Sequence, residues 1–134
     1  MALIPTAVTA YLGLVGLLAG SFINLAADRL PRRESVVSPR SHCRACGRQL
    51  NVVDLLPVVG YVVRGGRCAT CASPIGIESP LVEAVAGAAM LAPIVVIGVW
   101  PGAAVGLLAV ACWGLLVTAI SARRFATARE PNRA

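Results

Sequence analysis

The sequence predicts a mainly α-helical integral membrane protein with three transmembrane helices and a small zinc-ribbon-like cytoplasmic loop between the first and the second. The first observation is composition: 57% of the 134 residues are hydrophobic and 13% are charged, about half the charged fraction of soluble domains. The second is three long apolar stretches, and the third is two C-x-x-C pairs. We expect residues 1–134 to form a single domain, with the zinc loop at residues 28–79.

The first span is predicted at residues 6–27, which carry no charge and are long enough to cross a bilayer. Its small residues permit close helix packing, which membrane helices use in place of a hydrophobic drive. These residues are Gly13, Gly16, Ala19 and Gly20. Asn24, near the end of the span, is a polar group that needs a partner.

Arginines begin directly after this span, and they indicate which side of the membrane the loop occupies. They are Arg29, Arg32, Arg33 and Arg40, interrupted by Pro31 and Pro39, which prevent a continuous helix. Arginines next to a span mark the cytosolic side. We therefore expect the N-terminus outside, and the loop and the C-terminus in the cytoplasm.

Two closely spaced cysteine pairs, Cys43/Cys46 and Cys68/Cys71, predict a four-thiolate zinc site. The reducing cytosol favours metal over disulfides there. Gly47 follows the first pair at a position where such turns need positive φ, whereas Ala72 follows the second and is less typical. Within the metal interpretation, such a site usually only keeps a loop folded.

The segment between the cysteine pairs is too short and too interrupted by proline and glycine for another span. We expect an interfacial hairpin or a short amphipathic piece there, with Leu55, Leu56 and Tyr61 able to touch lipid. Asp54 lies in this apolar run. It is either a turn or cap residue or a candidate catalytic carboxylate.

A second span is predicted at residues 80–100 and a third at residues 103–121, joined by an outer turn at Trp100–Gly102. Ser79 and Pro80 form a helix-start signal. Glu83 lies near the membrane edge, where a carboxylate is either a functional group or a dipole-stabilised partner of an arginine such as Arg29. Pro93 should bend the second helix. Arginines return after the third span, as Arg123, Arg124, Arg129 and Arg133.

The motifs GLLAGSFINLAADRLPRRESVVSPRSHCRACGRQL, DLLPVVGYVVRGGRC and SPLVE, in this order, resemble the N-terminal half of bacterial type IV prepilin peptidases. The resemblance covers residues 13–90. It implies a multi-pass protein of the bacterial inner membrane, in a family of enzymes that cleave prepilin leaders and N-methylate the new N-terminus.

The peptidase half of that family needs two aspartates, and the sequence departs from the pattern for both. AISARRFATAREPN resembles a decayed version of the first aspartate motif, with Ser121 in place of the aspartate, and no G-x-G-D motif occurs. Aspartic proteolysis needs two carboxylates that share a proton. We expect a stand-alone N-terminal domain that does not cleave peptides.

Two function hypotheses remain open. In the first, the chain is an S-adenosylmethionine-dependent N-methyltransferase of pilin-like N-termini, with Glu83 as the best-matching base and Asp54 and Asp28 as the other candidates. In the second, it is a non-catalytic membrane zinc module that docks pilin-like helices or a separate peptidase subunit. Membrane lipid is an expected partner. Nucleic acid is not, because the arginines flank spans and no aromatic platform accompanies them.

Overall fold

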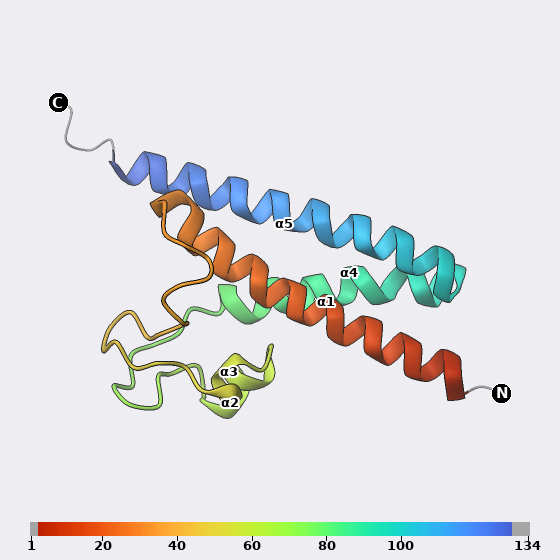
Figure 1. The fold of residues 1–134 in the computed structure, drawn as a ribbon, viewed down its shortest axis with the longest axis horizontal. Coiled ribbons are helices and arrows are strands. Elements are labelled where there is room, and N and C mark those ends of the chain that lie inside the picture. Colours follow the sequence, from red (N-terminus) through yellow and green to blue (C-terminus); the bar gives the residue numbers. More distant parts are fainter. Residues whose placement is uncertain (1–2, 130–134) are drawn as a thin grey trace.

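The computed structural model describes residues 3–129, which fold into three long helices and three short helical segments (Figure 1). The elements in chain order are α1 (Leu3–Arg29), η1 (Leu30–Arg32), α2 (Val52–Leu55), α3 (Val59–Val63), α4 (Glu78–Ile97) and α5 (Val99–Arg129). The helices α1, α4 and α5 are long and apolar enough to cross a membrane. The predicted fold class is therefore confirmed, while the single domain over residues 1–134 stays a prediction. Arg133 lies outside the described residues.

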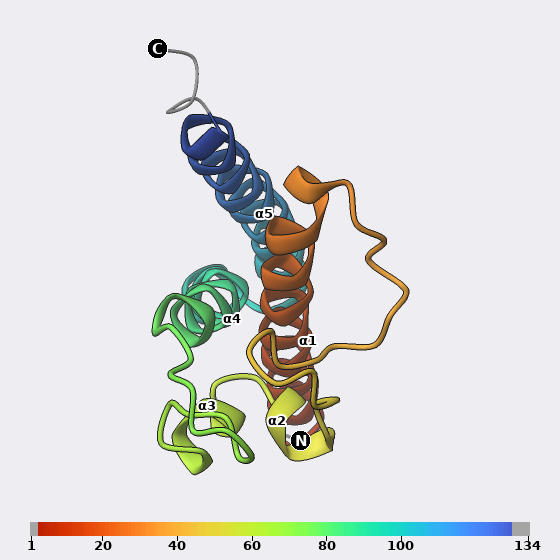
Figure 2. The ribbon, with the colours of Figure 1, turned by 90° about the vertical axis from the view of Figure 1, so that its left-hand side faces the viewer.

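The three long helices pack against one another, and the cysteine-bearing loop lies at one end of them. Each of α1, α4 and α5 contacts the other two. The loop leaves the bundle after η1 and returns to it at the start of α4, so it stays at the end where α1 and α5 finish (Figures 1 and 2). This arrangement places the loop against the ends of all three spans.

Close contact between α1 and α4 depends on glycines, as the sequence predicted. A Cβ added at Gly16 would lie 2.7 Å from the Cβ of Met90, and one added at Gly20 would lie 2.6 Å from the Cα of Glu83. These glycines are four residues apart and share one face of α1, in the small-xxx-small pattern of membrane helix pairs. The backbone of α1 therefore lies directly against α4 from Glu83 in its second turn to Met90 near its middle.

The buried core of the bundle lies mainly along α4. It consists of Ala86, Met90, Ile94 and Val110. Gly106 of α5 lets that helix approach the core, because a Cβ there would lie 2.8 Å from the carbonyl oxygen of Met90. Ala19 is partly buried and packs against the same cluster. The helix α4 is thus the central element against which the other two spans pack.

The turn between the second and third spans differs from the prediction of Trp100–Gly102. The break lies at Gly98, whose φ of 90° suits glycine, and α5 already begins at Val99. Pro101 is tolerated in the first turn of α5, where backbone N–H groups have no intrahelical partner. The predicted spans at 80–100 and 103–121 were therefore wrong at this boundary. The helix α4 runs through Pro93 without ending.

The segment between the cysteine pairs forms two short helices, α2 and α3. Of the two expectations for this segment, a hairpin or a short amphipathic piece, the hairpin is not formed. Within residues 3–129 no strand is formed, and the loop has only two isolated antiparallel bridges, His42 with Gln49 and Arg67 with Pro74. Each bridge closes the turn that carries one cysteine pair.

The close approach at Gly20 predicts that Gly20→Ala destabilises the bundle. The added methyl would meet the backbone of Glu83, which cannot move aside without separating the helices. Overpacking of this kind costs about 1–3 kcal/mol, measured by thermal unfolding in detergent. Gly114→Ala is the control, because its methyl would meet only the flexible side chain of Ile23 at 3.2 Å. Equal stability of both variants would contradict the packing argument.

Candidate metal centre and adjoining cavity

The four predicted cysteine ligands come together in the loop. Their sulfur atoms all lie within 4.8 Å of one another. The distance is 3.8 Å between Cys43 Sγ and Cys71 Sγ and 3.9 Å between Cys46 Sγ and Cys68 Sγ. A tetrahedral Zn²⁺ ion with Zn–S bonds of about 2.3 Å places its sulfurs about 3.8 Å apart. The donor set and its spacing therefore fit zinc, and the same distances are too long for disulfide bonds.

The two cysteine pairs are presented by two turns of the same design. In the first, Gly47 N–H donates to the carbonyl oxygen of Cys43 at 2.8 Å, and in the second Ala72 N–H donates to that of Cys68 at 3.0 Å. Both residues have positive φ, 73° at Gly47 and 54° at Ala72. Alanine at the second position is thus an unusual residue in the expected conformation, and the turn forms despite it.

Backbone amides around the sulfurs prepare two of the thiols for deprotonation. The amides of Cys71 and Thr70 hydrogen-bond to Cys68 and lower its pKa to about 6. The amides of Cys46 and Ala45 lower the pKa of Cys43 in the same way. At Cys71 the amide of Ser73 acts to lower the pKa, but burial and the other three sulfurs raise it to about 11. The thiolate is the form that binds metal, and a bound cation would favour it at all four positions.

Asp54 connects the metal site to the short helices. It is the third residue of a capping box with Asn51 at the start of α2, which bears out the interpretation as a cap. Its carboxylate also accepts hydrogen bonds from Arg48 at 2.6 Å and Arg64 at 2.7 Å. Burial acts to raise the pKa of Asp54, but the Asn51 amide and the two guanidiniums lower it below its usual value. The Arg48 guanidinium lies beside both Asp54 and the Cys68 thiol.

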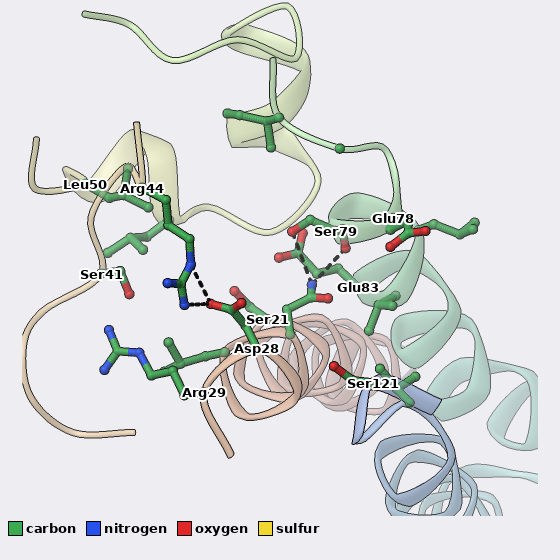
Figure 3. A pocket seen from close by; sticks show the side chains of 18 of the residues that line it. Ser21, Asp28, Arg29, Ser41, Arg44, Leu50, Glu78, Ser79, Glu83 and Ser121 are labelled. Carbon is green, nitrogen blue, oxygen red and sulfur yellow. Dashed lines mark hydrogen bonds and ion pairs between the residues drawn. The ribbon is translucent and has the colours of Figure 1, made fainter. Parts of the chain in front are cut away.

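A cavity of about 750 Å³ lies between the loop and the ends of the three spans, and a second of about 720 Å³ adjoins it on the loop side. Both are lined by Asp28, Asp54, Ser79 and Glu83. Figure 3 shows Asp28 and Arg44 facing each other on one side of the first cavity, with Ser79 and Glu83 at the start of α4 on the other. All the predicted carboxylates therefore lie around one space.

Glu83 is a buried carboxylate near the span ends, with 8% of the residue exposed. One oxygen accepts a hydrogen bond from the backbone N–H of Val58 at 2.7 Å. The other oxygen makes no hydrogen bond within residues 3–129. The alternative of a pair between Glu83 and Arg29 is wrong. Arg29 is buried, but it donates to the carbonyl oxygens of Ser35 and Pro39 at 2.7 and 2.8 Å.

Val58 holds an unusual backbone conformation where it meets Glu83. Its φ is 60° and its ψ is −48°, and Val59 N–H donates to the carbonyl oxygen of Pro57 across it at 2.5 Å. This is a γ-turn centred on a β-branched residue, a strained arrangement that costs about 1–3 kcal/mol. The turn directs the Val58 amide at the Glu83 carboxylate.

The start of α4 is fixed by a second polar contact. Asn24 of α1 donates from its amide nitrogen to the carbonyl oxygen of Ser79 at 2.8 Å and to the Ser79 hydroxyl at 3.3 Å. The prediction that Asn24 needs a partner is thus confirmed. Across the cavity, Ser121 of α5 donates to the carbonyl oxygen of Ala27 at 2.6 Å.

Sequence reasoning missed Arg48, Arg64 and the Val58 amide as parts of the site. The Asn51-x-x-Asp54 spacing is a recognisable capping-box signal and could have assigned Asp54 to a helix start. No local signal indicates Val58, because its positive φ is imposed by contacts that are distant in sequence. The pairing of Asp54 with Arg48 and Arg64 also depends on the path of the loop before and after α2, which no local pattern indicates.

Comparison with known proteins shows sequence relatives of one kind. The chain is 38% identical over 77 residues to the prepilin leader peptidase/N-methyltransferase of Myxococcus xanthus, covering 58% of this chain and 23% of that protein. It is 34% identical over 113 residues to the protein of the same name from Burkholderia pseudomallei strain K96243, covering 65% of this chain and 37% of that protein.

A third relative, the type 4 prepilin-like proteins leader peptide-processing enzyme of Escherichia coli, is 27% identical over 136 aligned positions. That match covers 87% of this chain and 49% of the relative. The chain therefore spans about a quarter to a half of the length of these three relatives. No solved structure matches it.

Residues 14–97 match the model of the bacterial peptidase A24 N-terminal domain, and this segment contains all four clustered cysteines, Asp54 and Glu83. The match extends over more than half of the chain. On this basis, the chain belongs to the bacterial peptidase A24 N-terminal domain family.

Proposed function

We propose that this chain is a zinc-organised membrane domain that N-methylates processed pilin-like proteins and does not itself cleave peptides. The proposal rests on one observation: a buried carboxylate, Glu83, lines a cavity of about 750 Å³ beside the ends of three membrane-spanning helices. The names of the relatives, which include an N-methyltransferase, give the reaction class.

Zinc is proposed to have a structural part in this function. Four thiolates complete a tetrahedral coordination shell and leave no open position for substrate or water. The ion would join the two cysteine turns, and Arg48 links that centre to Asp54 and α2. A fixed loop in turn holds the Pro57–Val58 turn against Glu83.

Glu83 is the proposed base for the substrate amine. An N-terminal α-amine has a pKa of about 7.7–8, so its ammonium form loses a proton close to neutral pH. A carboxylate placed beside it can bind the ammonium form and then accept that proton. The Val58 amide fixes one Glu83 oxygen, which leaves the second oxygen to face an amine. Its burial strengthens that interaction because little water competes.

The methyl group would come from bound S-adenosylmethionine. The cavity volume lies within the range of about 300–1,000 Å³ typical of small-molecule sites. Its lining combines carboxylates with apolar residues of the spans, such as Val82 and Val117. The lining also contains Arg29, Arg44 and Arg124, and three of its four carboxylates are ion-paired, so the support for this donor is the volume of the cavity.

Asp54 is less well supported as a catalytic group than Glu83. Both of its oxygens accept hydrogen bonds from arginines, and the side chain is only 6% exposed. These contacts favour a part in organising the loop. A free carboxylate is what proton transfer requires.

The absence of peptide cleavage by this chain is supported by Ser121. A serine hydroxyl that donates to the Ala27 carbonyl oxygen occupies the position where the resemblance expects the first aspartate.

We also propose the predicted inner-membrane topology. The arginines at the ends of α1 and α5 and the loop lie together, as expected for one cytosolic side.

The alternative function, non-catalytic docking of pilin-like helices or a separate peptidase subunit, has less support. The glycines that would serve helix association are already used inside the bundle, as at Gly16 and Gly106. A docking partner would have to bind the large apolar side chains that remain exposed. An assay of methyl transfer distinguishes the two functions, because only the enzymatic one predicts a methylated product.

The metal proposal predicts one Zn²⁺ per chain, measured by elemental analysis of purified protein. Cys68→Ser should lose most of the metal, because Cys68 is the buried member of the cluster and three ligands remain. Cys112→Ser is the matched control, since Cys112 lies outside the cluster and should leave the metal content unchanged. Less than a tenth of an ion in the unsubstituted protein would be incompatible with the proposal.

The base assignment predicts that Glu83→Gln lowers methyl transfer by about 10²–10⁴-fold. The assay follows labelled methyl from S-adenosylmethionine to a peptide with a free N-terminal phenylalanine. Glutamine keeps an oxygen that can accept the hydrogen bond from the Val58 amide. A lower rate of methyl transfer would therefore reflect the loss of the proton acceptor and not a change in packing. Glu34→Gln is the control, because Glu34 is exposed, pairs with Arg44 and does not line the cavity.

Two results would count against this function. If zinc-loaded protein in membrane-like conditions transfers no methyl group, the enzymatic proposal is wrong and docking is favoured. If Glu83→Gln and Glu34→Gln have the same rate of methyl transfer as the unsubstituted protein, another group is the base.

A further inference from the structure

Two arginines from different helices share one aromatic ring at the end of the bundle. The guanidinium carbon of Arg129 lies 4.6 Å from the centroid of the Phe125 ring, and that of Arg32 lies 5.8 Å from it. Arg32 belongs to η1 and Phe125 to α5, two elements that contact each other. Two positive charges therefore lie at one aromatic ring.

Acidic side chains compensate this charge only in part. Arg32 pairs with Asp28 at 3.4 Å, but Asp28 also pairs with Arg44. Within residues 3–129, Arg129 has no carboxylate partner. Residues 121–129 contain three arginines and no carboxylate. An excess of positive charge remains around Phe125.

The length of α5 places this cluster at the level of lipid headgroups. Its 31 residues extend about 46 Å, whereas the hydrocarbon core of a bilayer is about 30 Å thick. The apolar stretch of α5 ends at Ile120, and its first charge is Arg123. Residues 123–129 therefore project beyond the hydrocarbon core. The half-buried ring of Phe125 suits the boundary between acyl chains and headgroups.

We propose that Arg32, Phe125 and Arg129 form a binding site for the phosphate headgroup of an anionic phospholipid. Guanidinium groups bind phosphate oxygens through paired hydrogen bonds, and stacking on a ring pre-orients them for this. The lipid would lie at the junction of η1 and α5 and hold the ends of α1 and α5 together. The site is separate from the cysteine cluster and does not depend on methyl transfer.

The test uses purified protein in neutral detergent, with phosphatidylglycerol and phosphatidylcholine of the same acyl chains as probes. Native mass spectrometry measures the affinity of each lipid. We expect tighter binding of phosphatidylglycerol, and about five-fold weaker binding for Arg32→Ala and for Arg129→Ala, given the contribution of one arginine near anionic lipid. Phe125→Leu, which keeps apolar volume but removes the ring, should weaken it as well.

Arg40→Ala is the charge-matched control. Arg40 is exposed in the loop, and its side chain makes no ion pair within residues 3–129. Its replacement should change phosphatidylglycerol affinity by less than two-fold. Equal losses for Arg40→Ala and Arg129→Ala, or equal affinity for the two lipids, would overturn the proposal. So would variants that lose thermal stability equally in both lipids without a change in affinity, because the contact with Phe125 would then be purely structural.

Discussion

The contact between Gly20 of α1 and the backbone of Glu83 in α4 is the constraint on which the rest of the structure depends. Without a side chain at Gly20, the two helix backbones touch where α4 begins. This fixes the height and orientation of Glu83 relative to the end of α1. The Asn24–Ser79 hydrogen bond, one turn further along, restrains the same junction. The carboxylate is thus positioned by the spans themselves, and the loop has only to reach it.

The loop reaches Glu83 through a chain of contacts that starts at the sulfurs. The first cysteine turn holds the Arg48 backbone, Arg48 pairs with Asp54, and Asp54 completes the capping box of α2, which leads to Val58. Each contact is short, and each restrains a different part of the loop. Because residues 3–129 contain no strand in this loop, metal binding would replace the sheet that usually supports such a segment. The cysteine cluster and the cavity are therefore parts of one structural unit.

The sequence allowed the spans, the cysteine cluster and the use of glycine at Gly16 and Gly20 to be predicted, because each follows from local composition or spacing. The turn at Gly98 was missed because Trp100 is typical of a membrane interface and Pro101 fits a first helical turn as well as a loop. The alternative of an ion pair between Glu83 and Arg29 was also wrong. It rested on the position of both residues near the membrane edge, whereas backbone carbonyl oxygens accept the hydrogen bonds of that guanidinium.

The γ-turn at Val58 has a consequence for how the loop responds to a ligand. Valine is held with φ of 60° partly by the hydrogen bond from its amide to Glu83. A cation at the second Glu83 oxygen would leave this hydrogen bond in place, so the carboxylate would not have to turn to receive it. The strain of about 1–3 kcal/mol held at Val58 is thus a cost of keeping the carboxylate in one orientation before a ligand arrives.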